Sequence, residues 1–260
     1  MTAAIVIPAR YGSTRFAGKP LYVIAGVSML ERVWRIAQAV RGCSRVVIAT
    51  EDERIVAHAA TFGAEAVLTP ESCSNGTERV FAATQTANIT EDIVLNLQGD
   101  ALLTPPWVLE AMIAEMDTAP DAEIVTPAVR LEGAALESFR HHKLTSPASG
   151  ATVVFDANRN ALYFSKAVIP HLRHKGFASV YRHVGLYGYR RRGLEKYIAL
   201  PPTPLEQTEG LEQLRALEHG MKIRIVIVDY KGRTHGAVDS PEDVAVVEAV
   251  IAREGELIAR

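Results

Sequence analysis

The stretch IVIPARYGSTRFAGKPL, residues 5–21, decides the fold. Its first three residues, Ile5, Val6 and Ile7, are typical of a buried parallel strand. Pro8 cannot donate to a sheet ladder, so we expect the strand to end there. The loop that follows carries glycines, which let backbone amides approach a ligand, and cations that suit phosphate groups: Arg10, Gly12, Arg15, Gly18 and Lys19. The loop therefore predicts binding of an anion, and of a triphosphate in particular, with a solvated basic turn as the alternative.

The composition is that of a globular protein with a core of its own. The chain has 260 residues, of which 48% are hydrophobic, and its net charge of −2 gives no reason to expect nucleic acid or an anionic membrane surface as a partner. The two cysteines, Cys43 and Cys73, are too few for a disulfide framework and fit a reducing cytoplasm. We expect no signal peptide, and no apolar run approaches the roughly 18 residues of a membrane span.

Strand patterns and helix patterns alternate along the chain. Apolar strands are predicted at residues 5–7, 45–50, 64–69, 93–97, 123–129 and 222–228. Helix starts are predicted by two capping boxes, one from Ser28 to Glu31 and one from Thr50 to Glu53. This alternation predicts a three-layer α/β/α fold with a mostly parallel mixed sheet, and a single domain over residues 1–260.

The second half of the chain is less regular. Residues 151–156 and 161–165 read as a hairpin, which we expect to form a small β-rich arm and a dimer contact within residues 131–190. The alternating pattern of residues 182–190 predicts one strand, and residues 205–217 predict one helix.

Three polar segments lie next to these elements. A helix is predicted to begin at about Thr77, and Arg79 in its first turn opposes the helix dipole, which indicates a functional reason or a surface side chain. Asp100 directly follows a buried strand and is a natural Mg²⁺ ligand, although an Asp in a tight turn is the alternative. Ser240 and Pro241 read as the cap and first residue of a helix, which leaves Asp239 available for a metal.

These motifs resemble those of the 3-deoxy-manno-octulosonate (Kdo) cytidylyltransferase family, among the sugar nucleotidyltransferases. The family pattern reads roughly IPARYxSTRLPGKPL, and Phe16-Ala17 stands where the family has Leu-Pro. Further matches lie along nearly the whole chain, at residues 76–79, 96–100, 182–190, 211–215 and 238–243. The resemblance implies a Rossmann-like fold of the nucleotide-diphospho-sugar transferase type, and a homodimer.

The resemblance also implies an activity and a set of site residues. The expected reaction is Mg²⁺-dependent transfer of CMP from CTP to Kdo or a close 2-keto acid sugar, with pyrophosphate as the second product. The nucleotide would be held by Arg10, Ser13, Arg15, Lys19, Arg79 and Gln98. The catalytic groups would be Arg15 and Lys19 at the phosphates and Asp100 and Asp239 at the metal. The acidic sugar would be bound by Lys166, His183, Tyr187, Glu212 and Gln213.

Several positions depart from the family pattern. Cys73 and Asn75 replace a His and a Ser, and Ala101-Leu102 replaces Glu-Pro beside the expected metal ligand. Thr152 stands where the family commonly has a Lys, and Lys166 replaces an Arg, so an anionic acceptor would be held less tightly. Two alternatives follow: transfer to a different acidic acceptor, such as amino-Kdo or a nonulosonate, or a homologue that binds CTP or sugar without turnover. The retained aspartates argue against the second alternative.

Overall fold

The computed structural model of the protein describes residues 1–12, 16–173 and 179–258 of the 260-residue chain. Two of the predicted site residues, Ser13 and Arg15, lie outside these ranges. The chain divides into two compact units, which we call unit 1 (Met1–Ile113 with Tyr230–Arg260) and unit 2 (Ala114–Asp229). The predicted subregion at residues 131–190 falls inside unit 2. A single domain over the whole chain stays a prediction.

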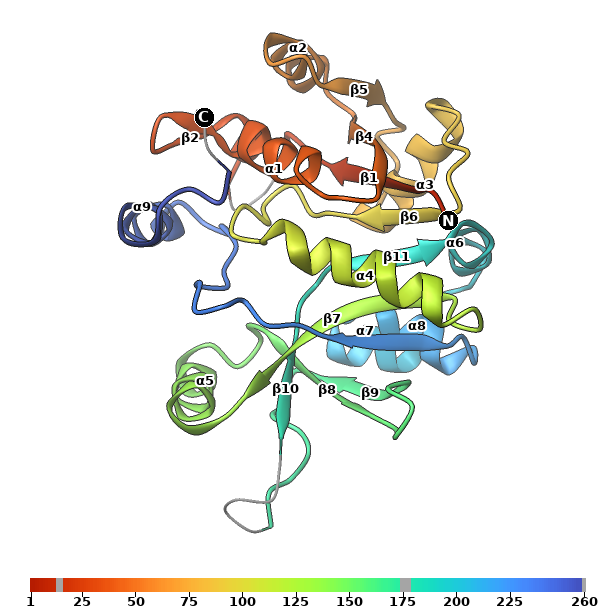
Figure 1. Ribbon diagram of the computed structural model, residues 1–260, viewed down its shortest axis with the longest axis vertical. Coiled ribbons are helices and arrows are strands. Elements are labelled where there is room, and N and C mark those ends of the chain that lie inside the picture. The colour runs from red at the N-terminus through yellow and green to blue at the C-terminus, as the bar shows by residue number, and fades with distance from the viewer. Residues whose placement is uncertain (13–15, 174–178, 259–260) are drawn as a thin grey trace. The chain divides into compact units, whose positions relative to one another are not determined.

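The sheet of unit 1 is parallel throughout its described strands (Figure 1). In order across the sheet these strands are β5 (Glu65–Leu68), β4 (Cys43–Thr50), β1 (Ala3–Pro8) and β6 (Ile93–Asn96). Every residue of β1 is buried, as the apolar run at its centre predicts, and the strand ends at Pro8.

Helices cover both faces of this sheet. The connecting helices are α1 (Met29–Gln38), α2 (Glu53–Thr61) and α3 (Gly76–Thr86). The chain first moves from β1 outward to β5 and then returns past β1 to β6. Because such crossovers are right-handed, α1 and α2 lie on one face and α3 lies on the other. The helix α9 (Glu242–Glu254) also belongs to unit 1, as do the short hairpin of β2 (Val23–Ile24) and β3 (Val27–Ser28) and a 3₁₀ turn, η1 (Lys19–Leu21).

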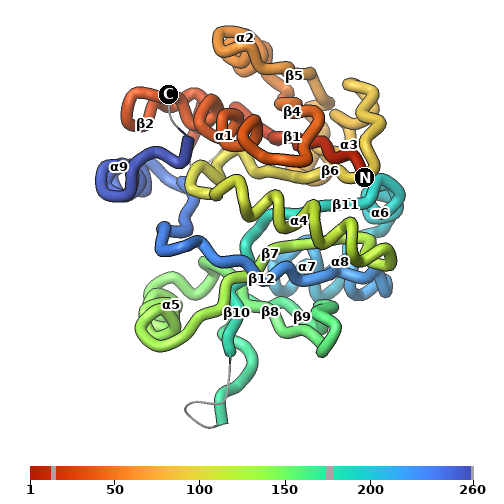
Figure 2. Tube along the Cα trace, in the orientation of Figure 1, coloured from red at the N-terminus to blue at the C-terminus, as the bar shows by residue number. Residues whose placement is uncertain are grey.

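Unit 2 is built around β7 (Ile124–Leu131), which pairs in parallel with β12 (Ile223–Ile227) (Figure 2). The remaining pairs are antiparallel, and their strands are β8 (Ala151–Phe155), β9 (Ala161–Ser165), β10 (Val180–His183) and β11 (Tyr187–Arg190). The predicted hairpin is present as β8 and β9. The other helices are α4 (Pro106–Thr118), which begins in unit 1, and α5 (Gly133–Thr145), α6 (Arg191–Ile198), α7 (Pro204–Glu209) and α8 (Gln213–Glu218).

The helix caps agree with the sequence in one case and differ in two. Ser28 caps α1 and accepts a hydrogen bond from the Glu31 amide at 3.2 Å. The predicted cap at Thr50 is wrong, because Thr50 is the last residue of β4 and Asp52 caps α2. At α9 the cap is Pro241, one residue later than predicted, since the Ser240 hydroxyl donates to the Asp243 carboxylate at 3.2 Å.

Two predicted elements of unit 2 are interrupted. The strand predicted for residues 182–190 is wrong as a single element, because residues 184–186 make a tight turn in which the Leu186 amide donates to the Val184 carbonyl at 2.7 Å. The helix predicted for residues 205–217 divides into α7 and α8 at Gly210, whose φ of 61° ends α7. No element was predicted for residues 133–145, where the structure has α5. No described helix is both long and apolar enough to cross a bilayer.

Candidate active site

A pocket of about 250 Å³ in unit 1 contains most of the predicted nucleotide and metal residues. The predicted residues that line it are Arg10, Lys19, Arg79, Gln98, Asp100 and Asp239. They come from the loop after β1, the start of α3, the loop after β6 and the loop before α9. Because parallel strands present their carboxyl ends at one edge of a sheet, segments far apart in sequence meet here.

The loop after β1 brings Lys19 into the pocket. The Gly18 amide donates to the Tyr11 carbonyl at 3.0 Å, which closes the loop, and Gly18 has a φ of 70° that only glycine adopts readily. Lys19 then opens η1, and its ammonium group donates to Asp100 Oδ2 at 2.6 Å and to the Val238 carbonyl at 2.8 Å. The predicted phosphate ligand and one predicted metal ligand are therefore in direct contact.

The two predicted metal ligands line the same pocket. Asp100 follows β6, and Asp239 lies in a loop that is fixed by a hydrogen bond of 2.8 Å from its amide to the Asp243 carboxylate. Mg²⁺ takes oxygen ligands and is usually held by one or two carboxylates together with substrate phosphates and water. Asp100 and Asp239 fit that donor set.

Close backbone packing places Asp100. The residue before it, Gly99, lies so near the end of β1 that a Cβ added there would stand 2.8 Å from the Pro8 carbonyl oxygen. Real Cβ atoms do not approach a carbonyl so closely, so the turn that presents Asp100 requires glycine at this position.

Arg79 is buried, so its place in the first turn of α3 is not that of a surface side chain. It donates to Thr69 Oγ1 at 2.7 Å and lies 3.1 Å from Glu51 Oε2. The other oxygen of Glu51 accepts from the Tyr11 amide at 2.9 Å. Glu51 thus neutralises Arg79 and also holds the start of the loop after β1.

The beginning of α3 faces the pocket together with Gln98. Asn75 caps the helix by accepting from the Glu78 amide at 2.9 Å, so this replacement for the family's Ser keeps the cap. Gln98 donates through Nε2 to the Asn96 side-chain oxygen at 3.0 Å. Cys73, which replaces the family's His, also lines the pocket, and burial raises the pKa of its thiol.

In unit 2, Thr126 fixes the orientation of His183. The Thr126 hydroxyl lies 2.7 Å from His183 Nε2 and 2.7 Å from the Leu186 carbonyl oxygen. A hydroxyl has one proton and a carbonyl can only accept, so Thr126 donates to Leu186 and His183 donates through Nε2. The same threonine therefore spans the turn between β10 and β11.

Three of the predicted sugar residues, His183, Tyr187 and Gln213, form a connected group. The rings of His183 and Tyr187 lie 5.7 Å apart, and Tyr187 donates its hydroxyl proton to Gln213 Oε1 at 2.8 Å. Burial, followed by the negative charge of Glu212, raises the pKa of Tyr187 and keeps that proton in place. Gln213 Nε2 is buried without a hydrogen-bond partner among the described residues, which favours a ligand oxygen as its partner.

Lys166, the fifth predicted sugar residue, is tied to α7 through its backbone. Its amide donates to Glu209 Oε2 at 2.7 Å, and Ser165 donates to Glu209 Oε1 at 2.7 Å. Burial raises the pKa of Glu209, but the hydrogen bonds from Lys166 and Ser165 outweigh it, so the pKa is lowered and Glu209 stays charged.

The sequence did not single out Glu51, Thr126 or Glu209 as site residues. Each acts on a predicted site residue that comes from a different segment: Glu51 on Arg79, Thr126 on His183 and Glu209 on Lys166. No local pattern marks such a contact. The one available signal was Glu51, a carboxylate directly after a buried strand, as Asp100 is.

Comparison with known proteins agrees with this geometry. The family model described as cytidylyltransferase matches residues 4–223. A 3-deoxy-manno-octulosonate cytidylyltransferase of Maricaulis maris is 53% identical over 259 residues, covering 99% of this chain and 100% of the relative. One from Desulfatibacillum aliphaticivorans is 40% identical and covers 96% of this chain and 99% of the relative.

Solved structures show the same fold. A CMP:2-keto-3-deoxy-manno-octonic acid synthetase in complex with CTP superposes with a TM-score of 0.87 at 34% identity, covering 98% of this chain and all of that one. A cytidylyltransferase of Leptospira borgpetersenii, 17% identical, superposes with a TM-score of 0.62 over 97% of this chain and 87% of its own. The predicted α/β fold of the nucleotidyltransferase type is confirmed. The chain belongs to the 3-deoxy-manno-octulosonate cytidylyltransferase family and is a nucleotidyltransferase.

Proposed function

We propose that the protein is a Mg²⁺-dependent cytidylyltransferase that transfers CMP from CTP to Kdo, or to a close 2-keto acid sugar, and releases pyrophosphate. The observation that carries this proposal is the pocket of unit 1, where cations for a triphosphate and two carboxylates for a metal meet. The substrates named for the similar proteins and the CTP bound to one of them support the same reaction.

The reaction is a single displacement at phosphorus. The anomeric hydroxyl oxygen of the sugar attacks the α-phosphorus of CTP, and the bond from that phosphorus to the oxygen bridging to the β-phosphate breaks. Pyrophosphate leaves with that oxygen, and the hydroxyl proton passes to solvent. No covalent enzyme intermediate is needed, so the protein has to position the substrates and neutralise charge.

The residues of unit 1 supply those two functions. Arg10 and Lys19 place positive charge at the pocket, where the phosphates of CTP would lie. Asp100 and Asp239 would hold Mg²⁺, which when bound neutralises phosphate charge and polarises a phosphoryl oxygen. Asp100 also keeps the Lys19 ammonium group in place, at 2.6 Å. Arg79 and Gln98 would face the cytidine, and Glu51 keeps Arg79 oriented.

Unit 2 would bind the acceptor. His183, Tyr187 and Gln213 are held in one group by a hydrogen bond and a tilted ring contact, and the buried Nε2 of Gln213 still offers its protons. A sugar hydroxyl or carboxylate oxygen would satisfy this donor. Lys166 supplies positive charge for an acidic acceptor.

Pyrophosphate release tests the proposal. The full-length protein is incubated with CTP, MgCl₂ and one of a panel of acceptors: Kdo, amino-Kdo, a nonulosonate and a neutral hexose. We expect release with Kdo, none with the neutral hexose, and loss of the signal when EDTA removes the metal.

Three results would each contradict a different part of the proposal. Release with a nonulosonate but not with Kdo would move the activity to another acidic acceptor, and full activity in EDTA would remove the metal dependence. Comparable catalytic efficiency with ATP in place of CTP would overturn the nucleotide assignment.

A further inference from the structure

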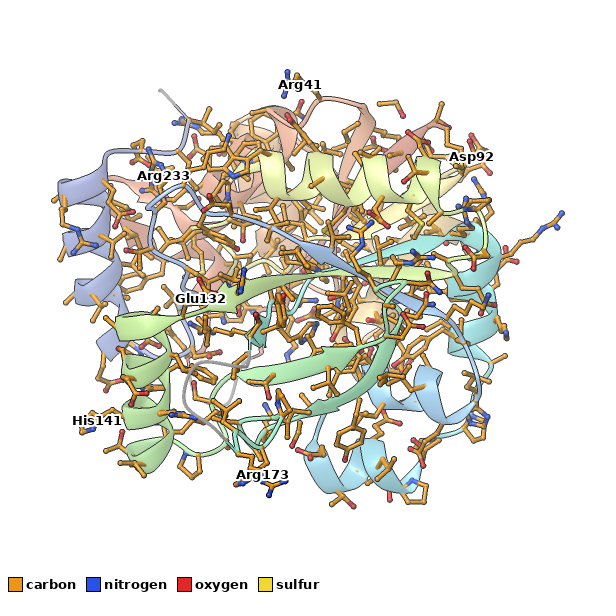
Figure 3. All side chains as sticks on the ribbon, turned by 60° about the horizontal axis from the view of Figure 1, so that its bottom comes forward. Arg41, Asp92, Glu132, His141, Arg173 and Arg233 are labelled. Atoms are coloured by element: carbon orange, nitrogen blue, oxygen red, sulfur yellow. The ribbon has the colours of Figure 1, made fainter. Side chains whose placement is uncertain are left out.

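Three cationic side chains lie near one another in unit 2, and two of them lie over the ring of Phe139. Lys143 Nζ, from α5, lies 5.4 Å from the ring centroid, and the Arg182 guanidinium, from β10, lies 5.5 Å from the same centroid. Figure 3 shows His141 of α5 pointing outward, and Lys143, two residues further along a helix of 3.6 residues per turn, lies on the opposite side. The third cation is Lys166, at the end of β9.

The backbone keeps these cations near one another. Lys143 donates to the Gly150 carbonyl at 2.7 Å, and a Cβ built on Gly150 would lie 3.8 Å from Arg182 Nε. Arg182 is the register partner of Thr152, and Thr152 is the register partner of Ser165, which directly precedes Lys166. Arg182, Thr152 and Ser165 are therefore successive neighbours across β10, β8 and β9, with Gly150 just before β8 and Lys166 just after β9.

The two lysines of this cluster have little compensating negative charge among the described residues. Lys143 donates to two neutral carbonyls, those of Pro147 and Gly150, and no described carboxylate forms an ion pair with the ammonium group of Lys143 or Lys166. Burial lowers the pKa of Lys143, and repulsion from Lys166 and then Arg182 lowers it further. The attraction of Glu209 opposes that shift, but Glu209 already accepts hydrogen bonds from Ser165 and Lys166. Like charges held this close favour a bound anion.

Position 152, where the family commonly has a lysine, carries no charge in this chain, whereas Lys143 of α5 does. The Thr152 side chain is fully buried, donates to the Ala167 carbonyl at 2.7 Å and accepts from the Ile169 amide at 3.1 Å. It therefore fixes the backbone that follows Lys166 and supplies no charge. A lysine at 152 would have to give up both hydrogen bonds.

We propose that Lys143 is a specificity-determining residue that holds the carboxylate of the acidic acceptor, together with Lys166 and Arg182. The inference rests on the proposed function, since it assigns a residue to the acceptor of that reaction. A carboxylate suits the cluster because Arg182 offers a planar fork and the lysines offer point charges around it. The group also connects to the other acceptor residues, because Glu209 holds the Lys166 amide and lies at the end of α7, just before α8 begins at Gln213.

The test compares two substitutions of Lys143. Lys143→Gln keeps an N–H donor for the loop carbonyls but removes the positive charge. Lys143→Arg keeps the donor and the charge. We expect Lys143→Gln to raise the KM for Kdo by about 10- to 100-fold, the range for loss of a charged hydrogen bond, with the KM for CTP changed by less than about threefold. Lys143→Arg should retain most of the affinity for Kdo.

Lys196→Gln is the matched control. Lys196 is a partly exposed lysine of the same unit whose ammonium group is paired with Glu123 at 2.8 Å, so its loss removes the same charge away from the cluster. We expect both KM values of this variant to equal those of the unaltered protein.

Three outcomes would overturn the inference. An unchanged KM for Kdo in Lys143→Gln would show that the lysine only braces its loop, and equal losses for Kdo and CTP would show a general structural effect. Altered inhibition by pyrophosphate alone would mean that the cluster binds a phosphate group. If the unaltered protein has no turnover, calorimetric titration of Kdo into each variant without CTP gives the same comparison of affinities. Failure of the proposed function can therefore be told apart from failure of this inference.

Discussion

A single carboxylate, Glu51, connects two parts of the pocket of unit 1 without being among the residues that line it. It accepts from the Tyr11 amide at the start of the loop after β1 and lies 3.1 Å from the buried guanidinium of Arg79. Because Arg79 has little access to water, the negative charge of Glu51 offsets the desolvation of its guanidinium. The arrangement gives the pocket a guanidinium held in a fixed position.

Glu51→Gln should therefore weaken both stability and CTP binding. Gln keeps an acceptor for the Tyr11 amide but leaves Arg79 as an uncompensated buried charge, which costs about 3–5 kcal/mol when one partner of such a pair is lost. We expect a lower free energy of unfolding in urea and a KM for CTP about tenfold higher, with the KM for Kdo nearly unchanged. Glu110→Gln, which breaks an ion pair with the exposed Arg41, is the control and should change neither value measurably.

The two carboxylates that we propose as Mg²⁺ ligands should behave differently from Glu51. Asp100→Ala and Asp239→Ala remove side chains that line an open pocket, so no core cavity forms and the free energy of unfolding should stay within about 1 kcal/mol. Turnover should fall by about 100-fold or more. Each substitution would remove a ligand of the Mg²⁺ that neutralises the charge developing on the phosphates. Pyrophosphate release and urea unfolding measure the two effects. Turnover near that of the unaltered protein in either variant would remove that residue from the metal site.

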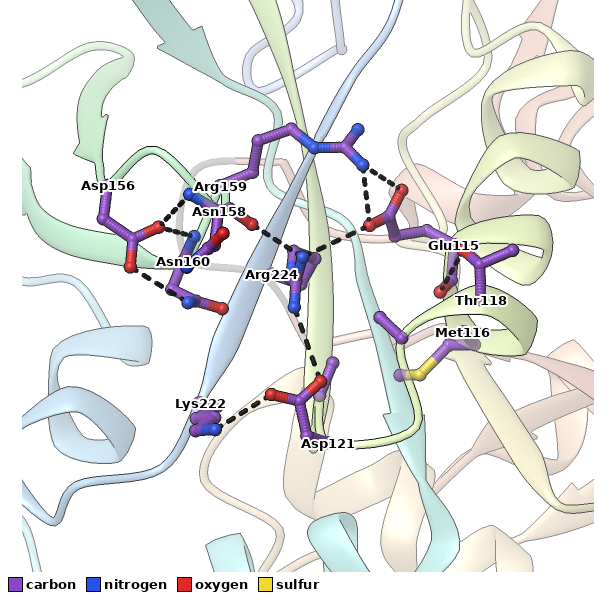
Figure 4. A network of polar contacts seen from close by, with 12 residues as sticks. Glu115, Met116, Thr118, Asp121, Asp156, Asn158, Arg159, Asn160, Lys222 and Arg224 are labelled. Atoms are coloured by element: carbon purple, nitrogen blue, oxygen red, sulfur yellow. Dashed lines mark hydrogen bonds and ion pairs between the residues drawn. The ribbon is translucent and has the colours of Figure 1, made fainter.

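Among the elements, the hairpin of β8 and β9 is fastened at its turn by a polar network (Figure 4). Arg224 of β12 donates to the Asn158 carbonyl at 2.6 Å, and its guanidinium also faces Glu115 at 3.9 Å and Asp121 at 3.4 Å. Asp156 closes the turn itself by accepting from the amides of Asn158 and Asn160, each at 2.8 Å. Arg224 thus links the hairpin turn, β12 and α4 within unit 2.

Arg224→Met should loosen this turn. The substitution keeps the aliphatic stem but leaves the Asn158 carbonyl and two carboxylates without their shared donor, so we expect a loss of about 1–3 kcal/mol in the free energy of unfolding. Hydrogen exchange at residues 156–160 should become faster. Lys222→Met, which removes a more exposed partner of Asp121, should leave exchange in the turn unchanged. Equal exchange in the two variants would show that Arg224 does not fasten the hairpin.

The elements also show where sequence reasoning holds and where it fails. β1, the Ser28 cap and the hairpin were predictable because each depends on residues next to one another in the chain. The cap of α2 was not, since Thr50 is drawn into β4 by pairing with β5 and its hydroxyl accepts from the Asp52 amide. The break at residues 184–186 depends on Thr126, a residue of β7 that no local pattern connects to it.

The residues of the candidate site also fall into those that local motifs identified and those that depend on contacts between distant segments. The motifs identified Lys19, Asp100 and Asp239, which the structure brings to one pocket. Residues such as Lys143 lie outside any motif, and their contribution depends on packing between α5, β10 and the end of β9. The homodimer stays a prediction, which the mass in solution relative to a 28.3 kDa chain can test.

The response of the protein as a whole to acid should follow its carboxylates. Hydrogen bonds from the Thr234 side chain and amide, and then from Arg253, lower the pKa of Glu254 to about 2 from an ordinary value of 4.5. The pKa of Asp243 is also lowered: burial raises it, but hydrogen bonds from the amides of Asp239 and Ser240 outweigh that effect. A carboxyl group with a lowered native pKa stabilises the fold fully above its unfolded pKa. That contribution is lost as the pH falls through the native pKa, so stability should decline between about pH 4.5 and pH 2.

Glu254→Gln should flatten this decline. Glu254 ends α9 and accepts from the Thr234 amide at 2.9 Å, and an amide side chain can still accept that bond but cannot titrate. The free energy of unfolding, measured in urea at pH 7, 5, 4 and 3, should fall less steeply below pH 4.5 in the variant than in the unaltered protein. At pH 7 the variant should be the less stable of the two, because the charged hydrogen bonds are lost there. Parallel curves through the acid range would show that Glu254 has the same pKa in the folded and unfolded chain.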